Sequence, residues 1–201
     1  MRKPSSHPAN QASHEVRIIG GQWKRSKLPV AEKPGLRPTP SRVRETLFNW
    51  LGQDLTGWRC LDAFAGTGAL GLEAASRGAV EVTLVEQDPA LCKSLQATVQ
   101  RLNAHSVRVE RGDGVAALRQ RGRQGLDLVF LDPPFGDDGN ELLFGAALQA
   151  ARHAVADNGL VYLEAPRAWD ADGLARLGLQ PHRHGKAGMV HFHLLQPLPP
   201  Q

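Results

Sequence analysis

The stretch WRCLDAFAGTGALGLEAASRG, Trp58 to Gly78, decides the fold. Residues 58–64 have the apolar pattern of a buried strand, and residues 69–78 have a helical pattern that Gly78 closes. Between them, Gly66, Gly68 and Gly71 form a GxGxxG pattern. Such a loop lets a ligand approach the backbone closely at the start of the following helix. The pattern alone is a weak signal, but it predicts a βα unit that binds a nucleotide or nucleoside.

Strand and helix patterns alternate from this unit towards the C-terminus. We predict strands at 81–86, 107–112, 126–132 and 159–165, and helices at 89–102, 114–122 and 140–153. This alternation is typical of βαβ units, and therefore of an α/β fold with a parallel sheet covered on both faces. Residues 178–196 differ, because two extended runs flank a Gly-Lys-Ala-Gly turn. They predict an antiparallel hairpin at the edge of the sheet.

The sequence predicts three segments along the whole chain. Residues 1–15 are polar and are expected to form a disordered tail. Residues 16–51 predict a small basic extension, with a hairpin around Gly20-Gly21 and a helix capped by Ser41 or Thr39. Residues 52–201 then form a Rossmann-like domain.

The charge of the chain is unevenly distributed. Residues 1–51 hold ten Lys and Arg against three Glu, whereas the remaining 150 residues hold fourteen against seventeen Asp and Glu. A basic front end on a neutral-to-acidic body favours contact with a polyanion, and a solvated lysine-rich face is the alternative. We find neither a membrane-spanning run nor a secretory signal. Cys60 and Cys92 lie far apart in apolar patterns, which fits a cytoplasmic protein without disulfides.

Acidic residues follow three successive predicted strands. They are Asp62, Glu86 and Asp113, and the carboxyl ends of parallel strands are where such sheets bind ligands. Asp62 disfavours a dinucleotide, whose phosphates need positive potential, and suits a cofactor with an ammonium group such as S-adenosylmethionine. Glu86 is spaced to bind ribose hydroxyls, and Asp113 could accept from an adenine amino group. Each acid alone could instead be a turn or helix-cap residue. A P-loop is excluded because no Gly-Lys-Ser/Thr follows the glycines.

The fourth of these strands ends in Asp132-Pro133-Pro134-Phe135. The prolines fix the backbone and remove N–H donors, which leaves carbonyl oxygens to accept hydrogen bonds. Asp132 adds a charged acceptor and Phe135 a flat face for stacking. A planar group with an exocyclic amino nitrogen needs this combination. With an ordinary pKa of about 3.9, Asp132 is expected to be ionised and able to accept a proton.

These motifs resemble those of known enzymes. DAFAGTGALGLEA (62–74), VEQD (85–88) and LDPPF (131–135) are similar to motifs of class I S-adenosylmethionine-dependent methyltransferases. RIIGGQWKRSKLPV (17–30) and LRPTPSRVRETLFNWL (36–51) are similar to the front end of the RsmD family, bacterial 16S ribosomal RNA guanine-N2 methyltransferases. The resemblance covers residues 17 to about 164 and is looser over the C-terminal hairpin.

The resemblance implies site residues of three kinds. The cofactor would contact Asp62, Phe64, Ala65, Gly66, Thr67, Gly68, Glu86, Gln87, Asp113 and Gly114. The catalytic residues would be Asp132, Pro133, Pro134 and Phe135. RNA would contact Arg17, Trp23, Lys24, Arg25, Lys27, Arg37, Arg42 and Arg44, although Trp23 could equally be a packing residue.

The resemblance implies methylation of the N2 of a guanine in 16S ribosomal RNA, within small ribosomal subunit particles, by a monomer. Methylation of DNA adenine N6 or of a protein glutamine, a nicotinamide oxidoreductase, and an RNA-binding assembly factor without catalysis are the alternatives. A single carboxylate could accept from both N1–H and N2–H₂ of guanine. The base assignment nevertheless rests on the front end and the family likeness.

Four histidines lie in the C-terminal hairpin: His182, His184, His191 and His193. Alternate strand positions share a face, which suggests a metal site. Nearby residues offer no Cys or carboxylate at ligand spacing, so we expect a solvated or RNA-facing hairpin and no metal.

Overall fold

The computed structural model describes residues 16–31, 39–122, 125–136 and 140–199, and the predicted tail 1–15 and Arg37 lie outside them. A seven-stranded sheet has the order β5-β4-β3-β6-β7-β9-β8. The strands are β3 (Arg59–Asp62), β4 (Glu81–Glu86), β5 (Val107–Arg111), β6 (Leu126–Leu131), β7 (Val155–Ala165), β8 (Leu179–Ala187) and β9 (Val190–Pro197). The pairs from β5 to β7 are parallel, and β9 runs antiparallel to both β7 and β8. The predicted Rossmann-like sheet with an antiparallel C-terminal hairpin is confirmed.

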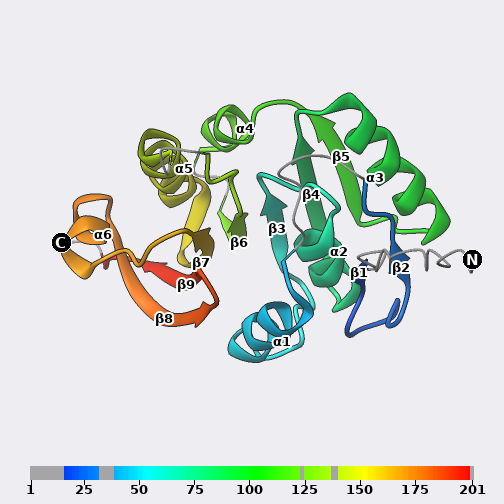
Figure 1. Ribbon diagram of the computed structural model, residues 1–201, viewed down its shortest axis with the longest axis horizontal. Coiled ribbons are helices and arrows are strands. Elements are labelled where there is room, and N and C mark those ends of the chain that lie inside the picture. The colour runs from blue at the N-terminus through cyan, green and yellow to red at the C-terminus, as the bar shows by residue number, and fades with distance from the viewer. Residues whose placement is uncertain (1–15, 32–38, 123–124, 137–139, 200–201) are drawn as a thin grey trace, which may run out of the picture.

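Helices cover both faces of this sheet (Figure 1). Side chains of α1 (Ser41–Trp50), α2 (Ala69–Ser76) and α3 (Pro89–Arg101) belong to one buried apolar cluster. Side chains of α4 (Gly114–Gln120), α5 (Glu141–Ala154) and α6 (Ala171–Arg176) belong to the other. The near-continuous apolar runs of the central strands β3, β4 and β6 fit this arrangement, because both sides of these strands are buried. Within the described part of the chain, no helix is long and apolar enough to cross a membrane.

Two elements near the C-terminus differ from the prediction. β7 begins at Val155, four residues before the predicted start, and a register shift between Leu126 and Leu128 accommodates the added length. The helix α6 was not predicted, because six residues give too little periodicity. The side chain of Asp170 caps it by accepting from the Gly173 N–H at 2.6 Å.

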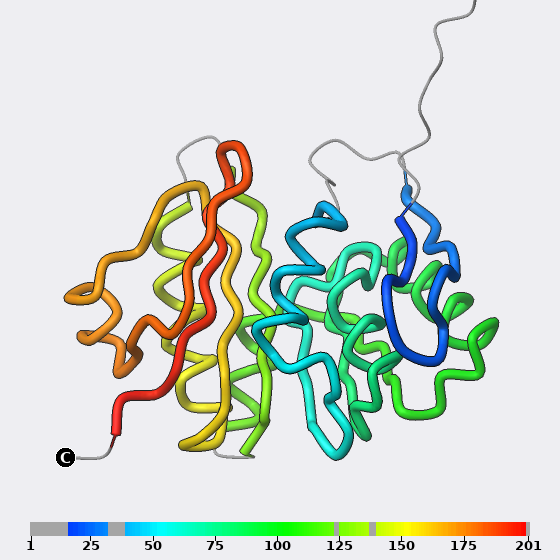
Figure 2. Tube along the Cα trace, turned by 90° about the horizontal axis from the view of Figure 1, so that it is seen from below, coloured from blue at the N-terminus to red at the C-terminus, as the bar shows by residue number. Residues whose placement is uncertain are grey.

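The N-terminal extension packs on the face that carries α1 and α2. β1 (Val16–Arg17) and β2 (Lys27–Leu28) form the predicted antiparallel hairpin. Val16, Ile18 and Leu28 are buried in the same cluster as α1 and α2. Figure 2 shows the hairpin lying over this face beside α1. The extension therefore shares the core of the sheet.

The helix α1 begins as predicted but is capped differently. Its N-cap is Pro40, and in the described chain no side-chain hydrogen bond caps it, so the predicted cap by Ser41 or Thr39 is wrong. Thr39 is buried, and its hydroxyl turns to the carboxyl ends of the strands.

A buried carboxylate on α2, Glu73, anchors the extension. It accepts from the backbone N–H groups of Ile19 and Gly20 at 2.8 Å each. It also pairs with Arg77 at 2.9 Å and with Arg44 at 3.4 Å. A buried carboxylate is tolerated only with such compensation.

Arg44 is part of this anchor. Its side chain is 2% exposed and donates to the carbonyl oxygens of Arg17 at 2.9 Å and Thr39 at 3.2 Å. With its donors turned inward, it holds α1 to the hairpin. The prediction that Arg44 contacts RNA phosphate is wrong.

Candidate active site

The strand ends that bear the acidic residues meet at one edge of the sheet. β4 lies on one side of β3 and β6 on the other, with Asp62 paired to both Leu84 and Phe130. The chain order therefore reverses at β3, and ligands of open α/β sheets bind outside the strands at such a point. Asp62, Glu86 and Asp132 all lie at this edge.

The loop after β3 takes its shape from left-handed glycines. Gly66 and Gly68 have φ of 53° and 78°, a region that side chains with a Cβ disfavour. A Cβ at Gly68 would also lie 2.8 Å from the Leu95 side chain. The Gly66 N–H donates to Glu86 Oε2 at 2.9 Å, which ties the loop to the end of β4. The loop is therefore fixed before any ligand binds.

Asp62 is buried and only partly satisfied. Its Oδ2 accepts from the Gly71 N–H at 3.0 Å, while its Oδ1 has no hydrogen-bond partner among the described residues. Burial raises the pKa of Asp62 to about 7, Glu86 and Glu164 add to the rise, and the amides of Gly71 and Phe64 oppose it. A buried acceptor without a donor is unfavourable. A ligand ammonium would supply both the donor and the compensating charge, so the site fits the amino group of a methionine-like ligand.

The other predicted cofactor residues also hold the protein together. Glu86 Oε1 accepts from the Asp88 N–H at 2.9 Å, so each of its oxygens fixes one loop. Asp113 caps α4 by accepting from the Ala116 N–H at 2.7 Å, and it also accepts from Gln87 Nε2 at 3.0 Å. The helix-cap alternative for Asp113 is therefore realised. Contacts of these residues with ribose and adenine stay predictions.

Close packing explains why residue 114 is a glycine. A Cβ at this position would lie 2.0 Å from the carbonyl oxygen of Ala63. Only glycine lets the start of α4 approach the loop after β3 so closely. A direct contact of Gly114 with the cofactor stays a prediction.

Asp132 lies beside a second carboxyl group that the sequence analysis missed. Leu131 pairs with Leu163 in the β6–β7 ladder, so Asp132 and Glu164 follow at adjacent strand ends. Glu164 is buried and accepts from the Tyr162 hydroxyl at 3.0 Å. The Thr39 hydroxyl forms hydrogen bonds with both carboxyl groups. A lone Glu near the end of the apolar run GLVYLEA was the available signal.

This neighbourhood changes the expected ionisation of Asp132. Burial raises its pKa well above the usual range, and the charges of Glu164 and Asp62 raise it further. The raised pKa works against the predicted ionisation of Asp132, which stays a prediction. The sequence could not place Glu164 next to it.

The Pro-Pro-Phe segment is partly anchored. Asn140 Nδ2 donates to the Pro134 carbonyl at 3.3 Å. The Phe135 ring lies 6.1 Å from the Phe144 ring, centroid to centroid, at an interplanar angle of 43°. One part of Phe135 therefore packs against α5, and it remains half-buried. Its use as a stacking platform stays a prediction.

Comparison with known proteins agrees with this geometry. A family model described as "Conserved hypothetical protein 95" matches residues 16–196. The chain is 40% identical over 205 residues to "Ribosomal RNA small subunit methyltransferase D" of Escherichia coli strain K12, across 98% of this chain and 95% of that protein. A protein of the same description from Haemophilus influenzae is 42% identical over 156 residues, 76% of this chain and 80% of that protein.

The solved structure of the Escherichia coli protein yhhF superposes with a TM-score of 0.77 at 37% identity, covering 92% of this chain and 98% of that chain. This chain belongs to the RsmD family. It is a class I methyltransferase.

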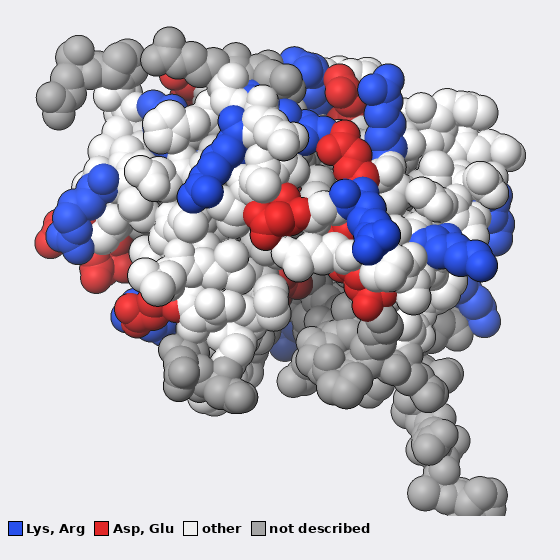
Figure 3. Space-filling view, turned by 90° about the horizontal axis from the view of Figure 1, so that it is seen from above, with Lys and Arg blue, Asp and Glu red and all other residues white. Residues whose placement is uncertain are grey.

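The extension of this RsmD family member carries several exposed cations. Arg17 and Lys27 face each other across the hairpin, on the side away from the core, and Lys24, Arg25 and Arg42 are also exposed. Trp23 is half-buried and packs against the core, which favours its packing role. The face that includes α4 and α5 differs, because cationic and anionic side chains are interspersed over it (Figure 3).

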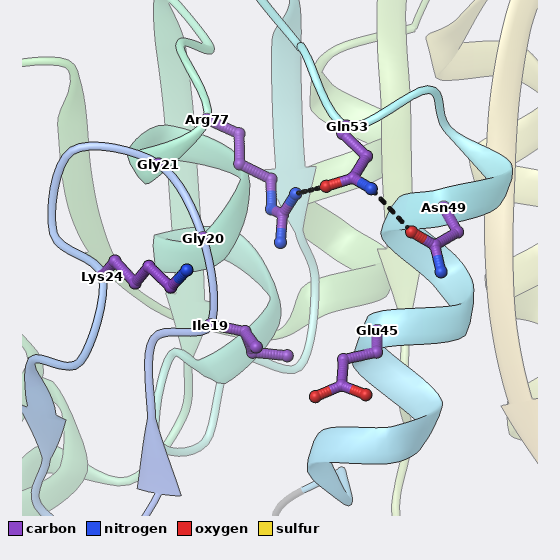
Figure 4. A pocket seen from close by; sticks show the side chains of 8 residues that line it. All are labelled: Ile19, Gly20, Gly21, Lys24, Glu45, Asn49, Gln53 and Arg77. Carbon is purple, nitrogen blue, oxygen red and sulfur yellow. Dashed lines mark hydrogen bonds between the residues drawn. The ribbon is translucent and has the colours of Figure 1, made fainter.

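A polar hollow separates the hairpin of the extension from α1 (Figure 4). Its volume is about 520 Å³. Arg77 donates to Gln53 at 3.1 Å, and Gln53 donates to Asn49 at 2.8 Å, while Lys24 and Glu45 come from opposite walls. The strand-end acids do not line it, so it is separate from the candidate active site.

Three histidines of the C-terminal hairpin, His184, His191 and His193, stack on one another. The ring of His184 lies 5.3 Å from that of His191 and 4.6 Å from that of His193, centroid to centroid. His193 is buried and accepts from the Trp169 N–H at 3.2 Å, and burial lowers its pKa to about 4. In the described residues, no group of three or more His, Cys, Asp or Glu side chains is arranged to hold a metal ion.

Proposed function

We propose that this protein methylates the exocyclic N2 of a guanine in 16S ribosomal RNA, with S-adenosylmethionine as the methyl donor. One observation carries the proposal. Asp62 pairs with Phe130 on the neighbouring strand, and Asp132 follows two residues later, roughly 6.6 Å further along. An acceptor for a ligand ammonium and an acceptor for a target amine therefore lie on adjacent strands.

The cofactor residues follow from this placement. When bound, S-adenosylmethionine supplies an electrophilic methyl group on a sulfonium. Asp62 would hold the ammonium, the loop around Gly66 and Gly68 would let the cofactor approach the backbone, and Glu86 would accept from ribose hydroxyls. Gln87, Asp113 and Gly114 would hold the adenine.

Asp132 and the Pro133 carbonyl hold the target amine. The lone pair of an aromatic amine is delocalised into its ring, which makes the nitrogen a poor nucleophile. Acceptors outside the ring plane draw the N–H bonds towards tetrahedral geometry and aim the lone pair at the methyl group. After transfer, the nitrogen loses a proton, which Asp132 accepts and passes to solvent. Phe135 stacks on the base, which has been turned out of its helix.

The extension supplies the RNA contacts in this proposal. Arg17, Lys24, Arg25, Lys27 and Arg42 contact phosphate, and the protein acts as a monomer in the cytoplasm on assembled or assembling small subunits. The names of the relatives support an RNA substrate.

A substrate panel tests the proposal. Purified protein is incubated with methyl-labelled S-adenosylmethionine and small subunits, protein-free 16S RNA, duplex DNA or total cell protein, and the products are digested and separated. We expect label in N2-methylguanosine, with small subunits as the best substrate. Label in DNA adenine or in protein glutamine would keep the chemistry and refute the substrate. Transfer to none of them would favour a non-catalytic assembly factor, and hydride transfer from a nicotinamide would favour an oxidoreductase.

We expect affinity for S-adenosylhomocysteine to fall in acid. This ligand has the ammonium but no sulfonium charge, and only ionised Asp62 can pair with it. Because the pKa of Asp62 is raised to about 7, protonation competes with binding below that pH. Affinity should weaken roughly tenfold per pH unit below it. Calorimetry between about pH 5 and 7, below the titration of the ligand amine, measures this.

Asp62→Asn is the matched control for this pH dependence. The variant should bind weakly at neutral pH and show a flat profile, because its amide does not titrate. Equal affinity of the natural protein at both ends of the range would contradict the role of Asp62.

A further inference from the structure

A chain of hydrogen bonds joins the ends of β6 and β7 to the start of α1. Asp132 and Glu164 lie at adjacent strand ends. Thr39 contacts both carboxyl groups, and Tyr162 donates to Glu164 Oε1 at 3.0 Å. Thr39 and Glu164 are each 4% exposed, so water contributes little to their hydrogen bonding.

Counting the hydrogen-bond donors indicates that one of the two carboxyl groups, Asp132 or Glu164, carries a proton. A threonine hydroxyl has a single proton to donate, so Thr39 cannot donate to two carboxylates at once. Glu164 already accepts a hydrogen bond from the Tyr162 hydroxyl, and the charge of Arg44 favours the ionised form of Glu164. Every group is satisfied when Asp132 is protonated and donates to Thr39, while Thr39 donates to an ionised Glu164.

The surrounding charges lead to the same assignment. Burial raises the pKa of both Asp132 and Glu164, but only Glu164 has Tyr162 and Arg44 to oppose the rise. The charged or titratable groups that face the pair are Asp62 from β3, Tyr162 from β7 and Arg44 from α1. Asp62 is in turn influenced by Glu86, and Arg44 by Glu73, Glu45 and Arg77. Asp132 is half-buried and Asp62 and Glu164 are buried, and carboxylates this close together do not all ionise readily.

We propose that Glu164 is a positioning residue that keeps a proton on Asp132 until a cationic ligand enters the site. The inference rests on the cofactor of the proposed function. With S-adenosylmethionine bound, the added positive charge favours ionised Asp132, which loses its proton to solvent. With S-adenosylhomocysteine bound, the sulfur is neutral and Asp132 keeps its proton. Asp132 thus becomes a charged acceptor for the target amine only when a methyl donor is present.

The test counts protons released on ligand binding, without RNA. Calorimetry in two buffers of different ionisation enthalpy gives the number of protons released by each ligand over roughly pH 6 to 7, below the titration of the ligand amine. Both ligands bind the ionised form of Asp62, so the proton that Asp62 releases cancels in the difference. For the natural protein we expect S-adenosylmethionine to release up to about one proton more than S-adenosylhomocysteine.

Isosteric variants locate the proton. Glu164→Gln removes the charge that retains it, so Asp132 is already ionised and the excess release disappears. Asp132→Asn removes the group that releases it, with the same result, and it serves if Glu164→Gln does not fold. Glu81→Gln, an exposed carboxylate paired with Arg59 at the other end of β4, should keep the excess.

The outcomes separate this inference from the proposed function. Equal proton release by both ligands in the natural protein, or an excess that survives in Glu164→Gln or Asp132→Asn, would refute the role of Glu164 and leave the cofactor intact. Failure of either ligand to bind would instead refute the cofactor.

Discussion

The Asp132→Ala variant should lose methyl transfer while it keeps its affinity for S-adenosylhomocysteine. The substitution removes both the acceptor that orients the target amine and the group that takes its proton. Losses of this kind lower a rate by on the order of 10³-fold. Asp132 directly follows β6, whereas Asp62, which binds the ligand ammonium in this proposal, ends β3. The dissociation constant of S-adenosylhomocysteine should therefore change by less than about threefold.

The measurement combines single-turnover methyl transfer with calorimetry. Asp132→Asn is the matched variant, because it keeps the shape of the side chain and one acceptor but cannot take a proton. Its rate should lie between those of Asp132→Ala and the natural protein. If Asp132→Ala lost S-adenosylhomocysteine binding as well, the assignment of Asp132 to the target amine would be wrong.

The largest loss of stability is expected for Glu73→Ala. The substitution leaves the guanidiniums of Arg44 and Arg77 and two backbone N–H groups of the hairpin without their buried acceptor. Breaking a buried ion pair costs about 3–5 kcal/mol, which lowers the melting temperature of a chain this size by roughly 6–20 °C. Thermal unfolding followed by circular dichroism measures the change.

Glu81→Ala is the control for that experiment. Glu81 pairs with Arg59 at 3.2 Å, but both side chains are well exposed, at 46% and 38%. Exposed pairs contribute about 0–1 kcal/mol, so the melting temperature should hardly change. A similar shift in both variants would show that Glu73 does not anchor the extension.

The arrangement of the sheet was predictable because it depends on local patterns. Apolar runs of strand length alternating with helical periodicity indicate a parallel sheet, and its topology brings Asp62, Glu86 and Asp132 to one edge. The hairpin of residues 178–196 was also predictable, although its turn lies at Gly188 and Met189, after the first three residues of the predicted Gly-Lys-Ala-Gly turn.

Contacts between distant segments were not predictable from the same patterns. Arg44 lies in a basic stretch and resembles a phosphate ligand. Its partner Glu73, however, lies 29 residues away in the sequence, and both side chains are buried. Asp132 has an ordinary pKa only if no other acid is near. Glu164 lies on β7, a different strand from the one that precedes Asp132, so the sequence alone does not show that the two acids are neighbours. Thr39 resembles a helix cap until the position of its hydroxyl is known.

The central claim is tested most directly by nucleoside mass spectrometry of 16S ribosomal RNA from cells that lack this protein. Guanosine methylated at N2 should decrease by one residue per 16S RNA, return with the natural protein, and stay absent with Asp132→Ala. An unchanged amount of N2-methylguanosine in the deletion strain would contradict the proposed function.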